Sequence, residues 1–190
     1  RVTPILVDPS ASDAYMLLIE AQGKTVLYSG DFRRHGRKAV LVDRLMAKPP
    51  RNVDVLLMEG TNLGSDKPCL TEDDLEDQFA DLFRSTAGRV FVGWSAQNVD
   101  RTVTLYRACK RTGRQLIVDL YTAEILVMLG EHTSLPQPGW PHLRVLISRS
   151  FARMYRSKGR VDFVSAMAQH GTSARTMAAS NDWVCMIRPS

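Results

Sequence analysis

The sequence has few of the residues that metal centres and disulfide frameworks need. It contains 3 cysteines and 4 histidines among 190 residues. Cys69, Cys109 and Cys185 lie far apart and form no CxxC pair, so neither a zinc ribbon nor a disulfide framework is indicated. Reduced thiols are typical of the cytoplasm, and we expect a cytoplasmic protein. No two histidines have the short spacing that places two imidazoles on one helix face.

Several other signals are missing. No apolar run approaches the ~18 residues of a membrane span, and the first residues show no signal-peptide pattern. There is no GxGxxG or Walker loop, so the sequence gives no support for a nucleotide cofactor. The chain begins at Arg1 rather than at Met, which is typical of a fragment or a processed product. Its hydrophobic content of 44% is enough for a core, and its length allows one α/β domain or somewhat more.

The most informative segment follows the apolar run 25–28. That run stops at Gly30-Asp31, and a dense basic patch comes next. An Asp just past a buried strand faces the rim of a sheet, where α/β proteins place metal ligands and catalytic carboxylates. A second apolar run, 53–58, likewise ends at Glu59. Paired carboxylates at strand ends suit divalent-metal binding or proton transfer, and an ordinary polar turn is the alternative.

Hydrophobic patterning predicts alternating strands and helices along the chain. The expected strands cover residues 14–20, 25–28, 53–58, 89–94, 115–119, 143–147 and 183–187. The expected helices cover residues 39–46, 71–85, 98–112, 122–129, 161–169 and 173–179. Residues 21–24 are typical of a turn that joins two antiparallel strands, so a hairpin is expected there. After residue 59, strand–helix alternation at this spacing is typical of a parallel, doubly wound sheet. Ser95 lies at a strand-to-helix junction like a nucleophile elbow, but the second glycine of that motif is missing, and we expect Ser95 to be a helix N-cap.

Several short motifs resemble a known family. They are DPSASDAY at 8–15, LIEA at 18–21, YSGDFR at 28–33 and MEGTN at 58–62. Together they resemble the second half of a metallo-β-lactamase-fold hydrolase, and residues 92–123 resemble the β-CASP insertion. That group includes the ribonuclease J-like and cleavage-and-polyadenylation-type nucleases. The resemblance implies an α/β fold: the C-terminal part of a metallo-β-lactamase αββα sandwich over 1–62, followed by a β-CASP-like parallel α/β domain over 63–190.

The resemblance also implies a two-zinc site, of which this chain carries a part. Asp31 matches the ligand that bridges the two zinc ions, and Glu59 matches the acid that helps orient a catalytic His. The family's His-x-His-x-Asp-His motif does not occur in the sequence, and Pro9 stands where a further ligand His is expected. A catalytic zinc needs about three protein ligands, so we expect the missing ligands upstream or downstream of this chain. By itself, the chain is expected to bind no stoichiometric zinc and to be inactive.

Positive charge gathers in three clusters, within a net charge of +5. The first is Arg33, Arg34, His35, Arg37 and Lys38. The second is Arg101, Arg107, Lys110, Arg111 and Arg114. The third is Arg149, Arg153, Arg156, Lys158 and Arg160, interleaved with Phe151, Tyr155 and Phe163. Clustered arginines suit a phosphate backbone, and aromatic side chains among them suit base stacking. The alternative for each cluster is a solvated face, and His35 could instead approach a metal beside Asp31.

These observations lead to a hypothesis about function. We expect part of a zinc-dependent metallo-hydrolase, a nuclease that hydrolyses phosphodiester bonds in RNA. One alternative is a non-catalytic nucleic-acid- or protein-binding module on the same fold, and another is a small-molecule metallo-hydrolase. Half of a sandwich would expose an apolar sheet face and unpaired strand edges. We therefore expect either a homodimer or an N-terminal half that completes the sandwich.

Overall fold

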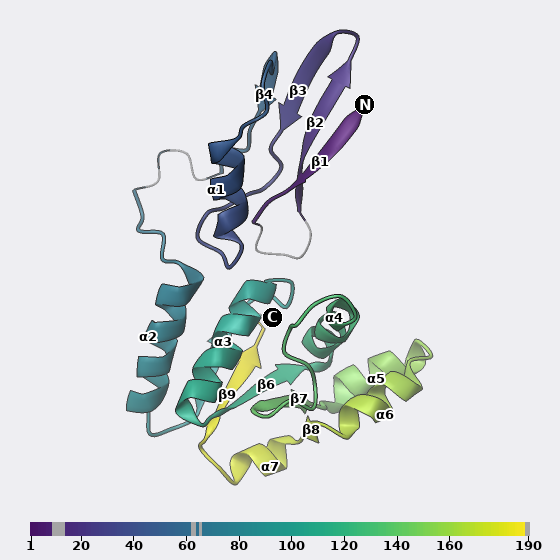
Figure 1. Ribbon diagram of the computed structural model, residues 1–190. Helices are drawn as coiled ribbons and strands as arrows, with labels where there is room; N and C mark the ends of the chain where they lie inside the picture. Colours follow the sequence, from purple (N-terminus) through teal and green to yellow (C-terminus); the bar gives the residue numbers. More distant parts are fainter. Residues whose placement is uncertain (9–13, 62–63, 65, 189–190) are drawn as a thin grey trace. The chain divides into compact units, whose positions relative to one another are not determined.

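The chain divides into two compact units. The computed structural model describes residues 1–8, 14–61, 64 and 66–188. Unit 1 is Arg1–Asp74 and unit 2 is Leu75–Ser190 (Figure 1). Their boundary lies in the first turn of helix α2 (Glu72–Ser85), later in the chain than the boundary predicted between residues 62 and 63. Each unit contains strands and helices, which confirms the α/β class. The αββα sandwich stays a prediction.

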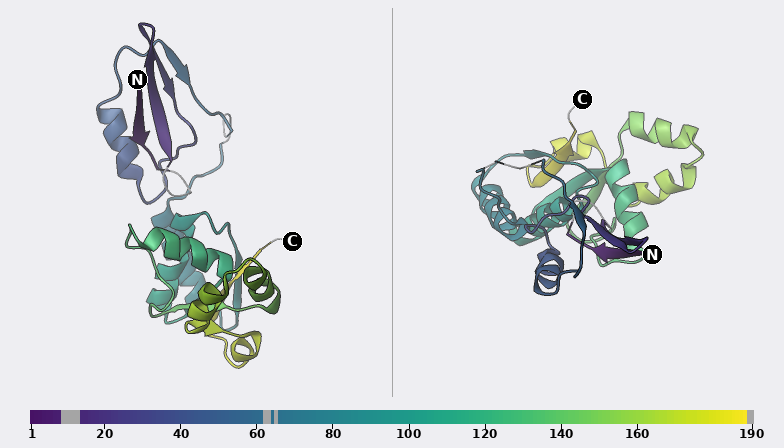
Figure 2. Two further views of the ribbon diagram at one scale, coloured as in Figure 1. Left: turned by 90° about the vertical axis from the view of Figure 1, so that its right-hand side faces the viewer. Right: turned by 90° about the horizontal axis from the view of Figure 1, so that it is seen from above.

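Unit 1 is built on one four-stranded sheet of order β1-β2-β3-β4. Its strands are β1 (Val2–Leu6), β2 (Tyr15–Ala21), β3 (Lys24–Tyr28) and β4 (Val55–Leu57). The first three pair antiparallel, while β3 and β4 pair in parallel and are connected through helix α1 (Ala39–Ala47) (Figure 2). Gln22 and Gly23 join β2 to β3 with φ of 52° and 71°, as a two-residue hairpin turn requires. The predicted hairpin is therefore confirmed.

Unit 2 contains a five-stranded sheet in which every pairing is parallel, as the alternation predicts. Its order is β5-β9-β6-β7-β8. The strands are β5 (Val90–Gly93), β6 (Gln115–Asp119), β7 (Leu143–Leu146), β8 (Gly171–Thr172) and β9 (Trp183–Ile187). The connecting helices are α3 (Val99–Thr112), α4 (Leu120–Gly130), α5 (Arg149–Ser157), α6 (Val161–Ala168) and α7 (Ala174–Ala178).

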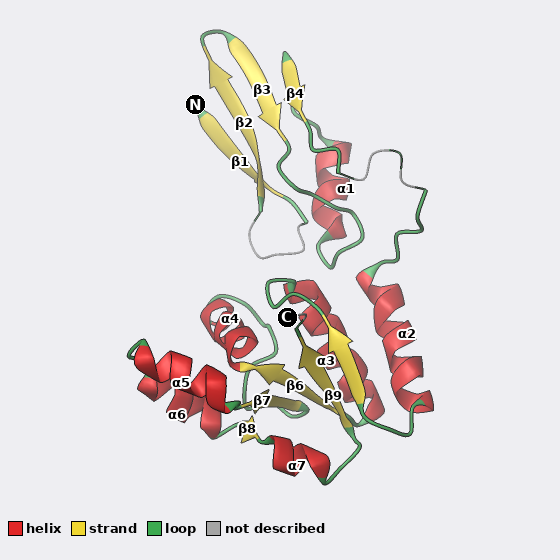
Figure 3. Cartoon of the chain, turned by 180° about the vertical axis from the view of Figure 1, so that it is seen from behind, coloured by secondary structure: helices red, strands yellow, loops and turns green. Residues whose placement is uncertain are grey.

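The direction of each crossover decides which face its helix covers. From β5 to β8 the chain moves one way along the sheet, and then it returns through α7 to β9. Because such crossovers are right-handed, the reversal places α7 on the face opposite to α3 and α4 (Figure 3). The alternation of side chains along β6 agrees with this placement of the helices. Leu116 and Val118 point into the large helical core, while Ile117 packs on the other face with Met177 of α7.

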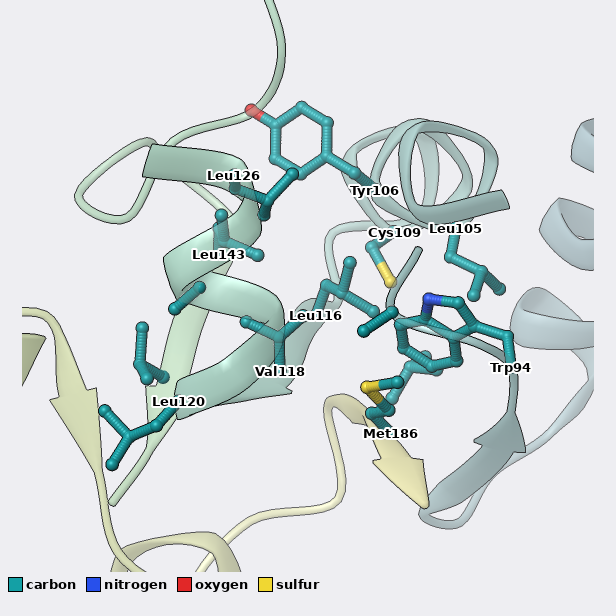
Figure 4. Close-up of a cluster of buried hydrophobic side chains, with 14 of the residues drawn as sticks. Trp94, Leu105, Tyr106, Cys109, Leu116, Val118, Leu120, Leu126, Leu143 and Met186 are labelled. Carbon is teal, nitrogen blue, oxygen red and sulfur yellow. The ribbon is translucent and has the colours of Figure 1, made fainter. Parts of the chain in front are cut away.

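The large core lies between α3, α4 and the sheet. Trp94 follows β5, and it gathers there with Cys109 of α3, Leu116 of β6 and Met186 of β9 (Figure 4). The indole Nε1 of Trp94 donates a hydrogen bond to Thr102 Oγ1 at 3.0 Å, so the ring is buried without leaving its N–H unsatisfied. This packing fixes the positions of the strand ends around it.

One expected helix cap is wrong, and three elements were not predicted. The N-cap of α3 is Asn98, whose side chain accepts from the N–H of Arg101 at 3.1 Å, and not Ser95. A turn closed by the Asn98 N–H and the carbonyl of Ser95 (2.9 Å) intervenes, so the helix begins later. Helix α5 and the short strands β1 and β8 were not predicted. None of the described helices is long and apolar enough to cross a membrane.

Candidate functional site

Asp31 and Glu59 follow two neighbouring parallel strands. Tyr28 at the end of β3 lies opposite Leu57 at the end of β4. Because the strands run in parallel, their carboxyl ends meet at one edge of the sheet, and both acids come directly after that edge. Asp31 is exposed and Glu59 is half-buried. The sheet thus brings the two predicted site segments together.

Ser29 ties these two segments to each other. Its N–H donates to the carbonyl of Leu57 at 2.9 Å, and the N–H of Glu59 donates to its hydroxyl at 3.2 Å. The same hydroxyl donates to the carbonyl of Gly30 at 2.8 Å. Ser29 is fully buried. Sequence reasoning did not single it out, although a small polar residue between an apolar strand and a glycine is a signal for such a link.

Glu59 is held as an anion. Its carboxylate accepts a hydrogen bond from the N–H of Thr61 at 3.0 Å. The backbone N–H of Thr61 lowers the pKa of Glu59, and the Thr61 hydroxyl lowers it further. Glu59 is therefore a hydrogen-bond acceptor at neutral pH, which is the state needed to orient a neighbouring proton donor.

Asp8 organises the basic loop that follows Asp31. Its buried carboxylate accepts from the N–H of Gly36 at 2.9 Å and from the N–H of Lys38 at 3.2 Å. Its carbonyl accepts from the N–H of Arg33 at 3.0 Å. The loop therefore winds round one buried anion, with backbone N–H groups as donors. Sequence reasoning assigned no role to Asp8, although an Asp directly after an apolar run is the same signal that identified Asp31.

Most of the basic loop already has acidic partners in unit 1. Arg34 Nε lies 2.8 Å from Asp43, and Arg37 lies 3.0 Å from Asp73. Arg33 lies 3.8 Å from Glu72, whose side chain is only 1% exposed. These pairs compensate much of the positive charge that a nucleic acid would meet. Nucleic-acid binding through Arg33, Arg34, His35, Arg37 and Lys38 stays a prediction.

His35 has a sulfur neighbour. Its Nδ1 lies 3.1 Å from Cys69 Sγ, and its carbonyl accepts from the N–H of Glu72 at 2.9 Å. Across residues 1–8, 14–61, 64 and 66–188, no group of three or more His, Cys, Asp or Glu side chains is arranged to hold a metal ion. Asp31 and the described side chains therefore do not fit a two-zinc site by themselves. Pro9 lies outside the described residues.

The three cysteines differ sharply in accessibility, and this predicts their reactivity. Cys69 is exposed. Burial raises the pKa of Cys109 to about 12, and burial together with Asp119 raises the pKa of Cys185 to about 11. At about pH 8 each buried thiolate is then a fraction of roughly 10⁻³ or less. We expect an aromatic disulfide reagent to modify one thiol per native chain and all three after unfolding.

Raising the pH to about 9 should not change that count, because the pH remains below both raised pKa values. The Cys69→Ser variant should show no rapidly reacting thiol. Two rapidly reacting thiols in the native wild-type chain would contradict the burial of Cys109 or Cys185.

A second group of polar side chains lies at the carboxyl end of the sheet in unit 2. Arg188 follows β9, and its Nε lies 2.6 Å from Asp119 at the end of β6. The guanidinium also lies over the ring of Tyr121, 4.7 Å from the centroid. Asp119 accepts from the N–H of Thr122 at 2.7 Å and so caps α4. This cluster connects two neighbouring strand ends and fixes the surface where ligands of parallel sheets bind.

The aromatic residues of the third basic cluster pack inside the protein. Tyr155 is buried and stacks on Phe163 with ring centroids 5.6 Å apart. Its hydroxyl donates to Glu124 at 2.6 Å, and Arg160 lies 2.7 Å from the same carboxylate. Phe151 is half-buried against the core. The prediction that these aromatic rings stack on bases is therefore wrong for Tyr155, because its side chain is buried and its ring stacks on Phe163.

The second basic cluster is also largely engaged within unit 2. Arg111 lies 2.7 Å from Asp77 and 3.3 Å from Glu76, and Arg107 lies 3.8 Å from Glu76. Arg114 is buried and donates to backbone carbonyls. Its assignment to a nucleic-acid surface is wrong, because a guanidinium enclosed by carbonyls cannot reach a phosphate.

Comparison with known proteins gives similarity to solved structures and no family assignment. No family model matches the sequence, and no curated protein matches it. A solved structure of a protein of unknown function from Enterococcus faecalis V583 matches with a TM-score of 0.73 and 18% sequence identity. The alignment covers 98% of this chain and 41% of that chain, so this chain spans less than half the length of its structural relative. The likeness shows that the fold occurs in a solved protein.

Proposed function

We propose that this chain is part of a metallo-β-lactamase-fold, β-CASP-type hydrolase that acts on RNA as a nuclease. The observation that carries the proposal is the placement of Asp31 and Glu59 after neighbouring parallel strands, with Ser29 linking their segments. The motifs around both acids support it, as does the parallel sheet of unit 2. Asp31 is proposed as a zinc ligand, and Glu59 as the acceptor that orients a proton-transfer residue.

The proposal needs ligands that the described residues do not supply. A catalytic zinc requires about three protein ligands, and no such group is found among the described side chains. The other ligands would have to come from outside the described residues. No hydrolytic step is assigned to Asp31 and Glu59 alone.

The test uses the protein with its natural flanking segments, loaded with zinc and mixed with labelled single-stranded RNA. We expect cleavage, and we expect Asp31→Asn to lower both the rate and the bound zinc, because a ligand oxygen loses its charge. Asp43→Asn is a matched control, since Asp43 pairs with Arg34 at the surface. Intact RNA at every pH, with zinc retained, would overturn the nuclease assignment.

A non-catalytic binding module is the second candidate. It is favoured by Pro9, which stands where the family pattern has a ligand His. The two candidates differ in the metal content of the protein with its flanking segments: a nuclease retains zinc after gel filtration, whereas a binding module does not. RNA that is bound but left intact by a zinc-free protein would favour the second candidate.

A further inference from the structure

Unit 2 carries an open groove with an unusual concentration of arginine. The groove has a volume of about 660 Å³ and is lined by three arginines, two serines and two apolar residues. The arginines are Arg149, Arg153 and Arg156, all on α5. Their spacing of four and three residues places them on one face of the helix. The lining contains no acidic residue among the parts of the chain that the structure describes.

The opposite face of α5 explains why the arginines point outward. Tyr155 is 6% exposed and belongs to the large core, and Phe151 packs against that core. Helix α5 packs beside α6, where Tyr155 stacks on Phe163 (Figure 2). An amphipathic helix fixed in this way has only its other face available for charged side chains. Packing against the core therefore fixes the orientation of α5, and with it the position of the face that carries the three arginines.

The charge of this groove is uncompensated, unlike that of the other basic clusters. Within the described residues, none of the three arginines lies within 4.0 Å of a carboxylate, whereas Arg160 on the adjacent turn pairs with Glu124 at 2.7 Å. Like charges three or four residues apart destabilise a helix. A chain that keeps three of them together without acidic partners bears a small cost in stability, which an anionic ligand would offset.

The groove also lies where a parallel sheet presents its ligand-binding edge. Ile147 and Ser148 follow the carboxyl end of β7 and line the groove. Ser148 caps α5 by accepting from the N–H of Phe151 at 3.3 Å. Ligands of open parallel sheets bind beyond the carboxyl ends of the strands, and the positive end of a helix dipole adds attraction for an anion. Position and charge therefore indicate the same class of ligand.

The length of the stripe favours an extended anion. Arg149 and Arg156 are seven residues apart, about 10 Å along the helix axis. A ligand with several phosphates can engage the whole stripe more readily than a single phosphate ion. Guanidinium groups bind phosphate through two parallel N–H donors. Among the described residues, the lining offers only Ile147 and Ala152 as apolar contacts, which is little for the hydrophobic anchors that protein partners use.

We propose that the α5 groove binds the phosphodiester backbone of a single-stranded nucleic acid through Arg149, Arg153 and Arg156. The substrate class rests on the proposed function, but the contact requires neither zinc nor Asp31. Binding is expected to be independent of base sequence, because the described residues that line the groove include no aromatic ring and the contacts are to phosphates. The groove would hold a strand near the carboxyl edge of the unit 2 sheet.

The test measures binding of the 190-residue chain to a fluorescein-labelled oligouridylate of about 12 nucleotides by anisotropy, with EDTA present. The variant carries Arg149→Gln, Arg153→Gln and Arg156→Gln. A control with the same net charge carries Arg44→Gln, Arg51→Gln and Arg175→Gln, all exposed and outside the groove. At about 50 mM salt we expect the groove variant to bind about tenfold or more weakly, and the control to change less than about twofold.

The salt dependence of binding provides a second measurement of the same contacts. Loss of three phosphate contacts should reduce the slope of log affinity against log salt by about 2, since each contact with a single strand contributes about 0.7. The corresponding triple lysine variant retains the charge and should keep most of the affinity. Circular dichroism must show the same fold for every variant.

Three results would overturn the proposal. They are equal losses for the groove and control variants, a triple lysine variant as weak as the glutamine one, and tighter binding of a labelled polyglutamate of the same length. The last result would assign the groove to an acidic protein partner. Because EDTA excludes metal-dependent cleavage, a failed nuclease assay with the groove effect intact would reject the proposed function alone.

Discussion

Replacement of Arg114 by alanine is expected to lower the free energy of unfolding of unit 2 by about 3–5 kcal/mol. Arg114 is 8% exposed, and its guanidinium donates to the backbone carbonyls of four residues. The distances are 3.0 Å to Phe83, 2.9 Å to Gly88 and 3.2 Å to Asn181, and a further bond reaches Thr86. One side chain therefore connects the C-terminal end of α2 with the segments that precede β5 and β9.

The size of the effect follows from what remains after the substitution. Alanine leaves these carbonyls without donors. Phe83 is buried, Thr86 and Gly88 are half-buried, and each unsatisfied buried group costs roughly 1–3 kcal/mol. Small relaxations and entering water reduce the sum. Arg114→Lys should have an intermediate effect, because an ammonium has three donors that cannot spread over four carbonyls in the planar arrangement of a guanidinium.

Tryptophan fluorescence during urea unfolding measures this change selectively. Trp94, Trp140 and Trp183 are the 3 tryptophans of the chain, and all of them belong to unit 2. Arg84→Ala is the matched control: Arg84 makes an exposed ion pair with Asp81 at 2.7 Å, so its loss should cost less than about 0.5 kcal/mol. A cost below about 1 kcal/mol for Arg114→Ala would show that the carbonyls find other donors.

Replacement of Asp8 by alanine is expected to release the basic loop. The carboxylate accepts from the N–H groups of Gly36 and Lys38, and hydrogen bonds to a charged group contribute about 1.5–3 kcal/mol each. We expect amide hydrogen exchange at Gly36 and Lys38 to accelerate by on the order of 10²-fold, because local opening no longer breaks these bonds. Trypsin should then cleave at Arg37 and Lys38 more rapidly.

Asp43→Ala provides the comparison for this experiment. Asp43 pairs with Arg34 at the surface, so its removal should leave exchange at Gly36 and Lys38 nearly unchanged. Unchanged exchange in Asp8→Ala would mean that the loop is held by the pairs of Arg33 with Glu72 and of Arg37 with Asp73 instead.

Local signals predicted most of the regular structure. Helix α3 shows why: its predicted range began at Asn98, and Gly113 ends the helix at φ 73°, so both ends are encoded within the segment, although Ser95 was expected as the N-cap in place of Asn98. Helix α5 was missed because only Phe151, Ala152 and Tyr155 of its residues carry the apolar stripe. Strand β8, with two residues, is too short for any periodic pattern to appear.

The candidate sites were less predictable because charge compensation depends on distant residues. The sequence shows that Arg33 and Arg114 are basic, but their partners Glu72 and Asn181 lie far along the chain. Only the fold shows that the first two clusters are largely paired or buried, and that three arginines of the third are not. The edge shared by Asp31 and Glu59 was accessible to sequence reasoning, because strand ends are local features.

The position of β9 has a consequence for how unit 2 forms during synthesis. Among the described strands β9 is the last in sequence, yet it lies between β5 and β6 in the sheet. Until residues 183–187 leave the ribosome, β5 has no parallel neighbour and one edge of β6 is open. The unit therefore cannot fold progressively from its N-terminal side, and its exposed strand edges need protection from aggregation until the last strand is inserted.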